Sequence, residues 1–388
     1  MKSSRYVLLS TSIILVLAML GSGMAVRVGA EDGSYKETVK FAEILSTIMD
    51  YYVDAVESDQ LMKGAYEGML GGLDANGAYL TPEEVGRWRT GVTGTAGPGI
   101  SILKVGRGVQ VVALAPGSPA EDAGVEIGDH LRLVDGNPTR DLSLLQTRRM
   151  IEGDAGSEVK LELLRPGAEF KTLQFSIVRQ AAIDRGYSID VQRGVAVLKI
   201  AAPGRIDREE LIAELDDVRS RGVSQLLLDL RNSSEYGPRD ITVLAGCLGA
   251  EAELRLRDSK GRVVESLTPE TGCEGWSGDI ALLINGATAG AAEALAQWFQ
   301  VADADVFGET SYGLGAEPKL YELESGAGLL VSTARWETVE GESWNETGIE
   351  PDTVVEGEGE EYEDVQEDQL AKVLEALEER SRESAEAA

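Results

Sequence analysis

The chain has 388 residues, with 36 Lys and Arg against 67 Asp and Glu, and a formal net charge of −31 at pH 7. This acidic balance argues against nucleic-acid binding, because phosphate contacts need clustered basic side chains. The single His and two Cys argue against multi-histidine zinc sites and zinc knuckles, so we expect no metal and no cofactor. The length predicts roughly two or three folded units.

Residues 1–30 have the pattern of a targeting segment. Lys2 and Arg5 precede an uncharged, apolar run over residues 6–26, and small residues follow it. This pattern indicates a signal peptide, although the run is also long enough to anchor the chain in a bilayer. With either alternative we expect the rest of the chain outside the cytoplasm, in the periplasm, in the cell envelope or secreted. Membrane contact is then expected only through residues 6–26.

Two different patterns follow along the chain. Apolar residues recur at helical spacing from Thr38 to Tyr52, and a second helix is predicted over 58–70, so residues 31–90 form a helical region. Residues 91–180 contain short strand-type runs at 109–114, 130–134, 159–164 and 173–178, separated by turn residues, with one helix over 143–151. This pattern is typical of a compact β-module with one or two helices.

Strands and helices alternate over residues 181–355, which predicts an α/β core with a partly parallel sheet. Apolar strand runs at 195–200, 225–230 and 281–284 are separated by helices at about 208–219 and 289–300. Residues 356–388 are rich in Glu and Asp, and we expect a short docking helix over 369–377 within a solvated tail. The predicted fold is therefore multidomain α/β.

Several segments together resemble the carboxyl-terminal processing peptidases, also called tail-specific serine proteases. They are LMKGAYEGMLGGLDANGAYLTPEE (61–84), GSPAEDAGVEIGDHLRLVDG (117–136), LLLDLRN (226–232), TGIEPDTVV (347–355) and EDQLAKVLEAL (367–377). The second segment is similar to a PDZ domain. The resemblance implies a helical N-terminal region, an inserted PDZ domain and an α/β protease core. It also implies a Ser nucleophile and a Lys base that cut proteins near apolar C-termini.

The positions that the resemblance assigns to catalysis do not carry catalytic side chains. The family's nucleophile stands three residues before a Glu, and here that position is Gly290, before Glu293. The family's Lys, in a Gly-Lys-Gly loop, corresponds to Leu314, and a Gln four residues later corresponds to Pro318. A Ser–Lys dyad needs a hydroxyl and a proton acceptor, so neither half is present.

The loop expected to bind the oxyanion also departs from the family pattern. Arg-Asn-Asn-Pro-Gly-Gly is replaced by RNSSEYG at 231–237, which lacks the paired glycines and adds an acidic residue. Thr288 and Lys319 are the fallback candidates for a rewired dyad, but Thr288 lies two residues before the family's nucleophile position and Lys319 five residues after its base position. Dyad catalysis tolerates little misplacement. We therefore predict a pseudoprotease, with a relocated serine/threonine-type peptidase as the alternative.

The PDZ-like β-module is still expected to bind peptides. A PDZ groove adds a peptide C-terminus as a strand and holds its carboxylate in a loop of backbone N–H groups. The matching loop is Gly97-Pro98-Gly99-Ile100, where Pro98 lacks an N–H. The opposite wall is predicted to include Leu144, Thr147 and Arg148. Expected partners are C-terminal peptides, unfolded proteins or an active paralogue, while a structural subunit without a groove is the second alternative.

The two cysteines, Cys247 and Cys273, would lie in an oxidising compartment if the chain is exported. A disulfide between them is favoured there, and two unpaired buried thiols are the alternative.

Overall fold

The computed structural model describes residues 32–90, 96–106, 108–115, 117–140, 142–167, 170–181, 186–201, 203, 206–234, 241–270, 275–359 and 362–387. The predicted targeting segment at residues 1–30 lies outside these ranges. Across the described ranges, no helix combines the length and apolar character needed to cross a membrane. The chain divides into two compact units, residues 1–65 and 66–388.

The first described elements are the two predicted N-terminal helices. Helix α2 covers Asp32–Tyr51 and α3 covers Ser58–Gly71. They are followed by β1 (Ala78–Leu80) and α4 (Pro82–Thr90). Strand β1 pairs with β18 (Gly328–Thr338), so part of the predicted helical region 31–90 belongs to a sheet formed mainly by the later part of the chain.

The β-module, residues 96–181, contains all the strands that the sequence predicted. Its main sheet has the order β3-β4-β5-β7-β8, with β6 beside β5. These strands and helices are β3 (Ile100–Val105), β4 (Gly108–Leu114), α5 (Pro119–Asp122), β5 (His130–Val134), β6 (Asn137–Pro138), α6 (Leu144–Ile151), β7 (Glu158–Arg165) and β8 (Lys171–Val178). Two short strands, β2 (Ala96–Gly97) and β9 (Gln180–Ala181), pair where the chain enters and leaves the module.

Helix α6 begins where the sequence predicted it because Ser143 forms a capping box with Gln146. The Ser143 side chain accepts the Gln146 N–H, and the Gln146 side chain accepts the Ser143 N–H. Strand β3 was not predicted. It forms the edge of the sheet directly after the Gly97–Ile100 loop.

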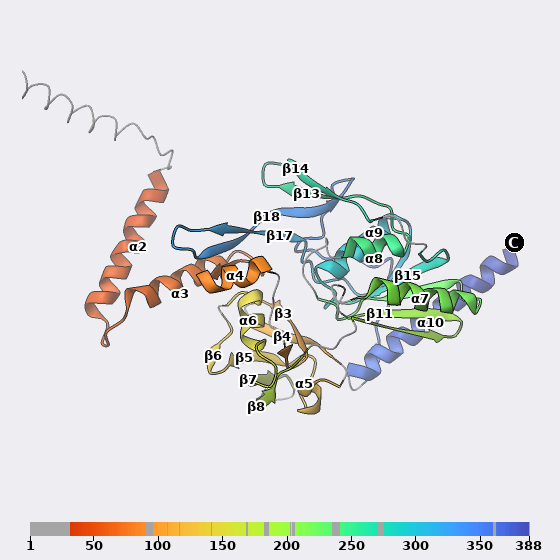
Figure 1. The fold of residues 1–388 in the computed structure, drawn as a ribbon, viewed down its shortest axis with the longest axis horizontal. Coiled ribbons are helices and arrows are strands. Elements are labelled where there is room, and N and C mark those ends of the chain that lie inside the picture. Colours follow the sequence, from red (N-terminus) through yellow and green to blue (C-terminus); the bar gives the residue numbers. More distant parts are fainter. Residues whose placement is uncertain are drawn as a thin grey trace, which may run out of the picture. The chain divides into compact units, whose positions relative to one another are not determined.

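The core, residues 186–387, is built on a six-stranded sheet of order β10-β11-β12-β15-β16-β19. Two of its strands, β11 and β15, are labelled in Figure 1. Strand β10 is antiparallel to β11, and the others are parallel. The strands are β10 (Tyr187–Gln192), β11 (Val195–Ile200), β12 (Gln225–Asp229), β15 (Asp279–Ile284), β16 (Asp305–Gly308) and β19 (Thr353–Val354). The predicted α/β core is therefore confirmed.

Helices cover both faces of this sheet. Helices α7 (Arg208–Ser220), α8 (Thr242–Cys247) and α9 (Ala291–Val301) share one apolar cluster with alternate residues of the strands. Residues between them face the other side, where α10 (Tyr362–Ala387) packs through Val373, Leu374 and Leu377. Helix α10 is longer than the short helix predicted over 369–377, because it extends over 26 residues. Its buried residues, Gln369, Val373, Leu374 and Leu377, all lie within the predicted docking range, and residues 379–382 are exposed.

A second sheet stands beside the core. It consists of β1, β13 (Leu254–Asp258), β14 (Val263–Leu267), β17 (Ala316–Glu322) and β18. Strand β18 pairs with β17 along one side and with β1 and β13 along the other.

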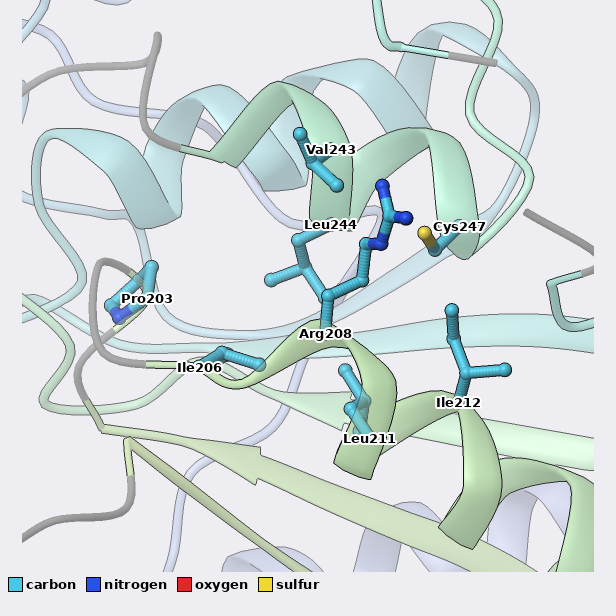
Figure 2. A pocket seen from close by; sticks show the side chains of 8 residues that line it. All are labelled: Pro203, Ile206, Arg208, Leu211, Ile212, Val243, Leu244 and Cys247. Atoms are coloured by element: carbon cyan, nitrogen blue, oxygen red, sulfur yellow. The ribbon is translucent and has the colours of Figure 1, made fainter. Parts of the chain in front are cut away.

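Cys247 ends α8 and is buried in a disulfide. Cys273 lies outside the described residues, so its pairing with Cys247 stays a prediction. Figure 2 shows Cys247 in a small hollow between α7 and α8, with Arg208, Leu211 and Leu244 among its lining residues. None of the predicted catalytic or peptide-binding residues lines this hollow.

Candidate functional site

Gly290 occupies a sharp turn between strand β15 and helix α9. Its backbone has φ 62° and ψ −113°, a conformation that glycine adopts without the penalty that a side chain would bring. Serine hydrolases present their nucleophile at a strained strand-to-helix turn of this kind. The turn is therefore shaped like a nucleophile elbow, but Gly290 offers no atom that could attack a carbonyl.

Thr288 stabilises this turn through its hydroxyl. The side chain is fully buried, and its Oγ1 donates to the Leu230 carbonyl at 2.9 Å. The same oxygen accepts the Asn285 N–H at 3.0 Å. Leu230 follows β12 and Asn285 follows β15, so the Thr288 hydroxyl joins the ends of two parallel strands.

The central polar residue of the site is Glu293, in the first turn of α9. Its carboxylate is fully buried and accepts four hydrogen bonds. Oε1 accepts the Ser311 hydroxyl at 2.5 Å and the Gly313 N–H at 2.6 Å. Oε2 accepts the Gly290 N–H at 2.9 Å and the Leu314 N–H at 2.8 Å. The carboxylate thus ties the nucleophile position directly to the base position.

Burial raises the pKa of Glu293 to about 7, while the Ser311 hydroxyl and the backbone N–H groups act in the opposite direction. Ser311 is itself held in place, because its oxygen accepts the Ile349 N–H at 2.7 Å. The sequence pattern identified Glu293 only as the residue from which the nucleophile position is counted. The spacing of three residues between Gly290 and Glu293 is that of a helix capping pair, and it was the available signal for this contact.

The predicted base positions lie along the next loop and strand. Leu314 is half-buried and packs against an apolar cluster that contains both β-module and elbow residues. Pro318 lies in β17 beside a bulge. Lys319 is exposed, and its ammonium group lies 5.6 Å from the centre of the Tyr321 ring.

The fallback pair of Thr288 and Lys319 is therefore split between two environments. Thr288 is fully buried at the elbow, while Lys319 faces solvent on β17. Among the interactions of the described residues, none joins these two side chains.

The start of the predicted oxyanion loop is tied to helix α10. Arg231 is buried and makes a two-bond ion pair with Asp229, at 2.8 and 2.7 Å. Its guanidinium also donates to the Gln366 carbonyl at 2.7 Å and to the Gln369 side chain at 3.0 Å. The contacts with α10 were missed, because Gln366 and Gln369 are more than a hundred residues away from Arg231 in sequence.

Asn232 continues this network with a left-handed backbone of φ 64°. Its Oδ1 accepts the Tyr362 hydroxyl at 2.7 Å and the Asn285 amide at 2.9 Å. Burial raises the pKa of Tyr362, so its hydroxyl remains a donor at neutral pH. Residues 235–240, which include the acidic substitution in the predicted oxyanion loop, lie outside the described residues.

The predicted carboxylate loop lies at the start of β3. Gly97 belongs to β2, and the Pro98 carbonyl accepts the Ala120 N–H at 2.9 Å. Gly99 has φ 82°, and a Cβ built there would stand 2.3 Å from the Ser118 Cβ, so this position requires glycine. Ile100 begins β3 and is partly accessible.

The predicted opposite wall on α6 is largely covered in this structure. Leu144 and Thr147 are fully buried, and neither reaches solvent. Arg148 is half-buried and donates to the Ser234 carbonyl of the core at 3.0 Å. The structure therefore places these three residues in packing and in a contact with the core.

Comparisons with known proteins agree with this architecture. Residues 194–355 match the description "Peptidase family S41" and residues 110–165 match "PDZ domain". The carboxy-terminal-processing protease of Bartonella bacilliformis is 27% identical over 351 residues, 89% of this chain and 81% of the relative. Carboxy-terminal processing protease CtpA of Bacillus subtilis is 24% identical over 357 residues, 90% of this chain and 76% of the relative.

A solved structure has the same arrangement. The photosystem II D1 C-terminal processing protease aligns with a TM-score of 0.63 and 25% identity, over 82% of this chain and 93% of that one. The fold and both family matches agree. Residues 194–355 form a peptidase family S41 domain, residues 110–165 form a PDZ domain, and the chain is similar to carboxyl-terminal processing proteases.

Proposed function

We propose that this chain is an extracytoplasmic member of the family that binds protein C-termini without cleaving them. The observation that carries the proposal is Gly290, which stands at the nucleophile elbow and has no side chain. Leu314 supports it, because an aliphatic side chain at the base position cannot accept a proton. Residues 1–30 support the extracytoplasmic location through their signal-like pattern.

The fallback peptidase receives little support from the site. The Thr288 hydroxyl donates to a backbone carbonyl, so deprotonation would cost that hydrogen bond, and Lys319 is exposed elsewhere. The relatives are named proteases, so peptidase activity remains the alternative function.

Peptide binding is supported by the β-module. Its Gly97–Ile100 loop precedes an edge strand, the arrangement that PDZ-type strand addition uses. The ligand class is an extended protein C-terminus, from an unfolded protein or from an active paralogue that this chain would scaffold or regulate. The alternative of a structural subunit without a groove predicts no such binding.

We expect the full chain to bind a fluorescein-labelled decapeptide ending in Leu-Ala-Ala, measured by fluorescence anisotropy. Amidation of its C-terminus should weaken binding by about tenfold or more, because a charge-assisted hydrogen bond contributes roughly 1.5–3 kcal/mol. Gly99→Ala should abolish binding, because the added Cβ meets Ser118.

Gly106→Ala is the matched control, since Gly106 also has a positive φ but a Cβ there meets no atom within 4 Å. Equal binding of the free acid and the amide would contradict recognition of C-termini. Absence of binding by both would favour the structural subunit.

A further inference from the structure

The free edge of strand β3 can be identified from the strand register. Among the described strands, β3 is the outermost of its sheet and pairs only with β4. Val111 of β4 exchanges backbone hydrogen bonds with Gly128 and Asp129, so its polar groups face β5. Its partner Ile102 must then direct its N–H and C=O away from β4, and the two-residue repeat extends this to Lys104. These are the groups that an added peptide strand would use.

One of these edge groups is already bound by the core. The Tyr312 hydroxyl donates to the Lys104 carbonyl at 2.7 Å. The Tyr312 N–H donates to the Thr288 carbonyl at 2.9 Å, so a single residue links the peptide edge to the elbow turn. Burial raises the pKa of Tyr312 to about 12, which keeps the hydroxyl protonated and able to donate.

Apolar contacts reinforce this link. Tyr312 and Leu314 pack against a cluster that contains Ile102 and Leu103 of β3. The elbow residues Ala287 and Ala289 are buried in the same cluster. The base position is therefore filled by a side chain that serves the contact between the β-module and the core.

We propose that the core segment Ser311–Leu314 is a built-in competitor at the peptide edge of β3, and that a bound C-terminus must displace the Tyr312 hydroxyl from the Lys104 carbonyl. This proposal rests on the peptide binding proposed above. It gives Tyr312 and Leu314 a regulatory role at that site, in which the core limits the affinity of the groove.

Tyr312→Phe removes one hydroxyl and keeps the ring in place. The full-length variant should bind the Leu-Ala-Ala decapeptide roughly fivefold more tightly, because a neutral hydrogen bond contributes about 1 kcal/mol. Amide hydrogen exchange over residues 100–105 should also become faster without peptide, because the hydrogen bond that holds Tyr312 against this strand edge is lost and the edge opens more often. Tyr321→Phe is the matched control, because Tyr321 is exposed on β17.

The two readouts separate this proposal from the proposed function. Unchanged affinity together with unchanged exchange in Tyr312→Phe would overturn the proposal that Ser311–Leu314 competes with the peptide. The proposed peptide binding itself would stand. Faster exchange in a protein that binds no peptide would support the Tyr312 contact and overturn the proposed peptide binding. Tighter binding by Tyr321→Phe to the same extent would also overturn the role of Tyr312.

Discussion

Replacing Arg231 by leucine is expected to lower the free energy of unfolding by about 3–5 kcal/mol, because the change leaves a buried carboxylate without its partner. Asp229 is only 2% exposed, and both of its oxygens bond to Arg231. The variant also removes the two hydrogen bonds that Arg231 donates to helix α10. Urea unfolding followed by circular dichroism measures the loss.

Two further variants define the cause. Arg221→Leu breaks an exposed ion pair with Asp217, and it should change the free energy of unfolding by less than about 1 kcal/mol. Adding Asp229→Asn to Arg231→Leu removes the unpaired buried carboxylate and should recover part of the lost stability. A loss below about 1 kcal/mol in Arg231→Leu would mean that the buried pair does not hold α10 against the core.

The second large effect concerns the pH dependence of stability. The pKa of Glu293 is about 7 in the folded protein against an ordinary value of 4.5, because the carboxyl group is buried. Between these values the unfolded chain releases a proton that the folded protein keeps. The free energy of unfolding should therefore fall as pH rises from about 4.5 to 7, and this group should contribute about 3 kcal/mol to the fall.

Glu293→Gln removes the titrating group and so isolates its contribution to the pH dependence of the unfolding free energy. The difference in unfolding free energy between pH 5 and pH 8 should be smaller in this variant than in the parent chain, by an amount approaching 3 kcal/mol. Glu340→Gln changes the net charge equally at an exposed position and should leave the parent's pH dependence unchanged. Parallel curves for the parent and Glu293→Gln would contradict a raised pKa.

The sequence predicted the parts of this protein that depend on local pattern. Short strand-type runs separated by turn residues predicted β4, β5, β7 and β8, and the capping pair Ser143 and Gln146 begins helix α6 at the predicted place. Strand β3 was missed because its polar residues Ser101 and Lys104 interrupt the apolar run beside a glycine-rich loop. Helix α10 was underestimated because its acidic residues suggested a solvated tail.

The candidate site includes contacts that the sequence does not indicate. Counting back from Glu293 placed Gly290 at the family's nucleophile position, and the Gly-Lys-Gly pattern placed Leu314 at the position of the Lys base. The structure brings both residues to the Glu293 carboxylate. Nothing in the local sequence indicates that Tyr312 bonds to Lys104, because the two residues are 208 positions apart. Long-range polar contacts of this kind depend on tertiary packing.

The most direct test of the central claim is an overnight digest of an unfolded protein with an apolar C-terminus by the purified chain, followed by mass spectrometry. Gly290 and Leu314 stay untouched, and a Thr288→Ala, Lys319→Ala variant controls for contaminating peptidases. We expect no cleavage above that control. Cleavage that disappears in the variant would show that the catalytic groups have moved, and it would contradict a binding protein without peptidase activity.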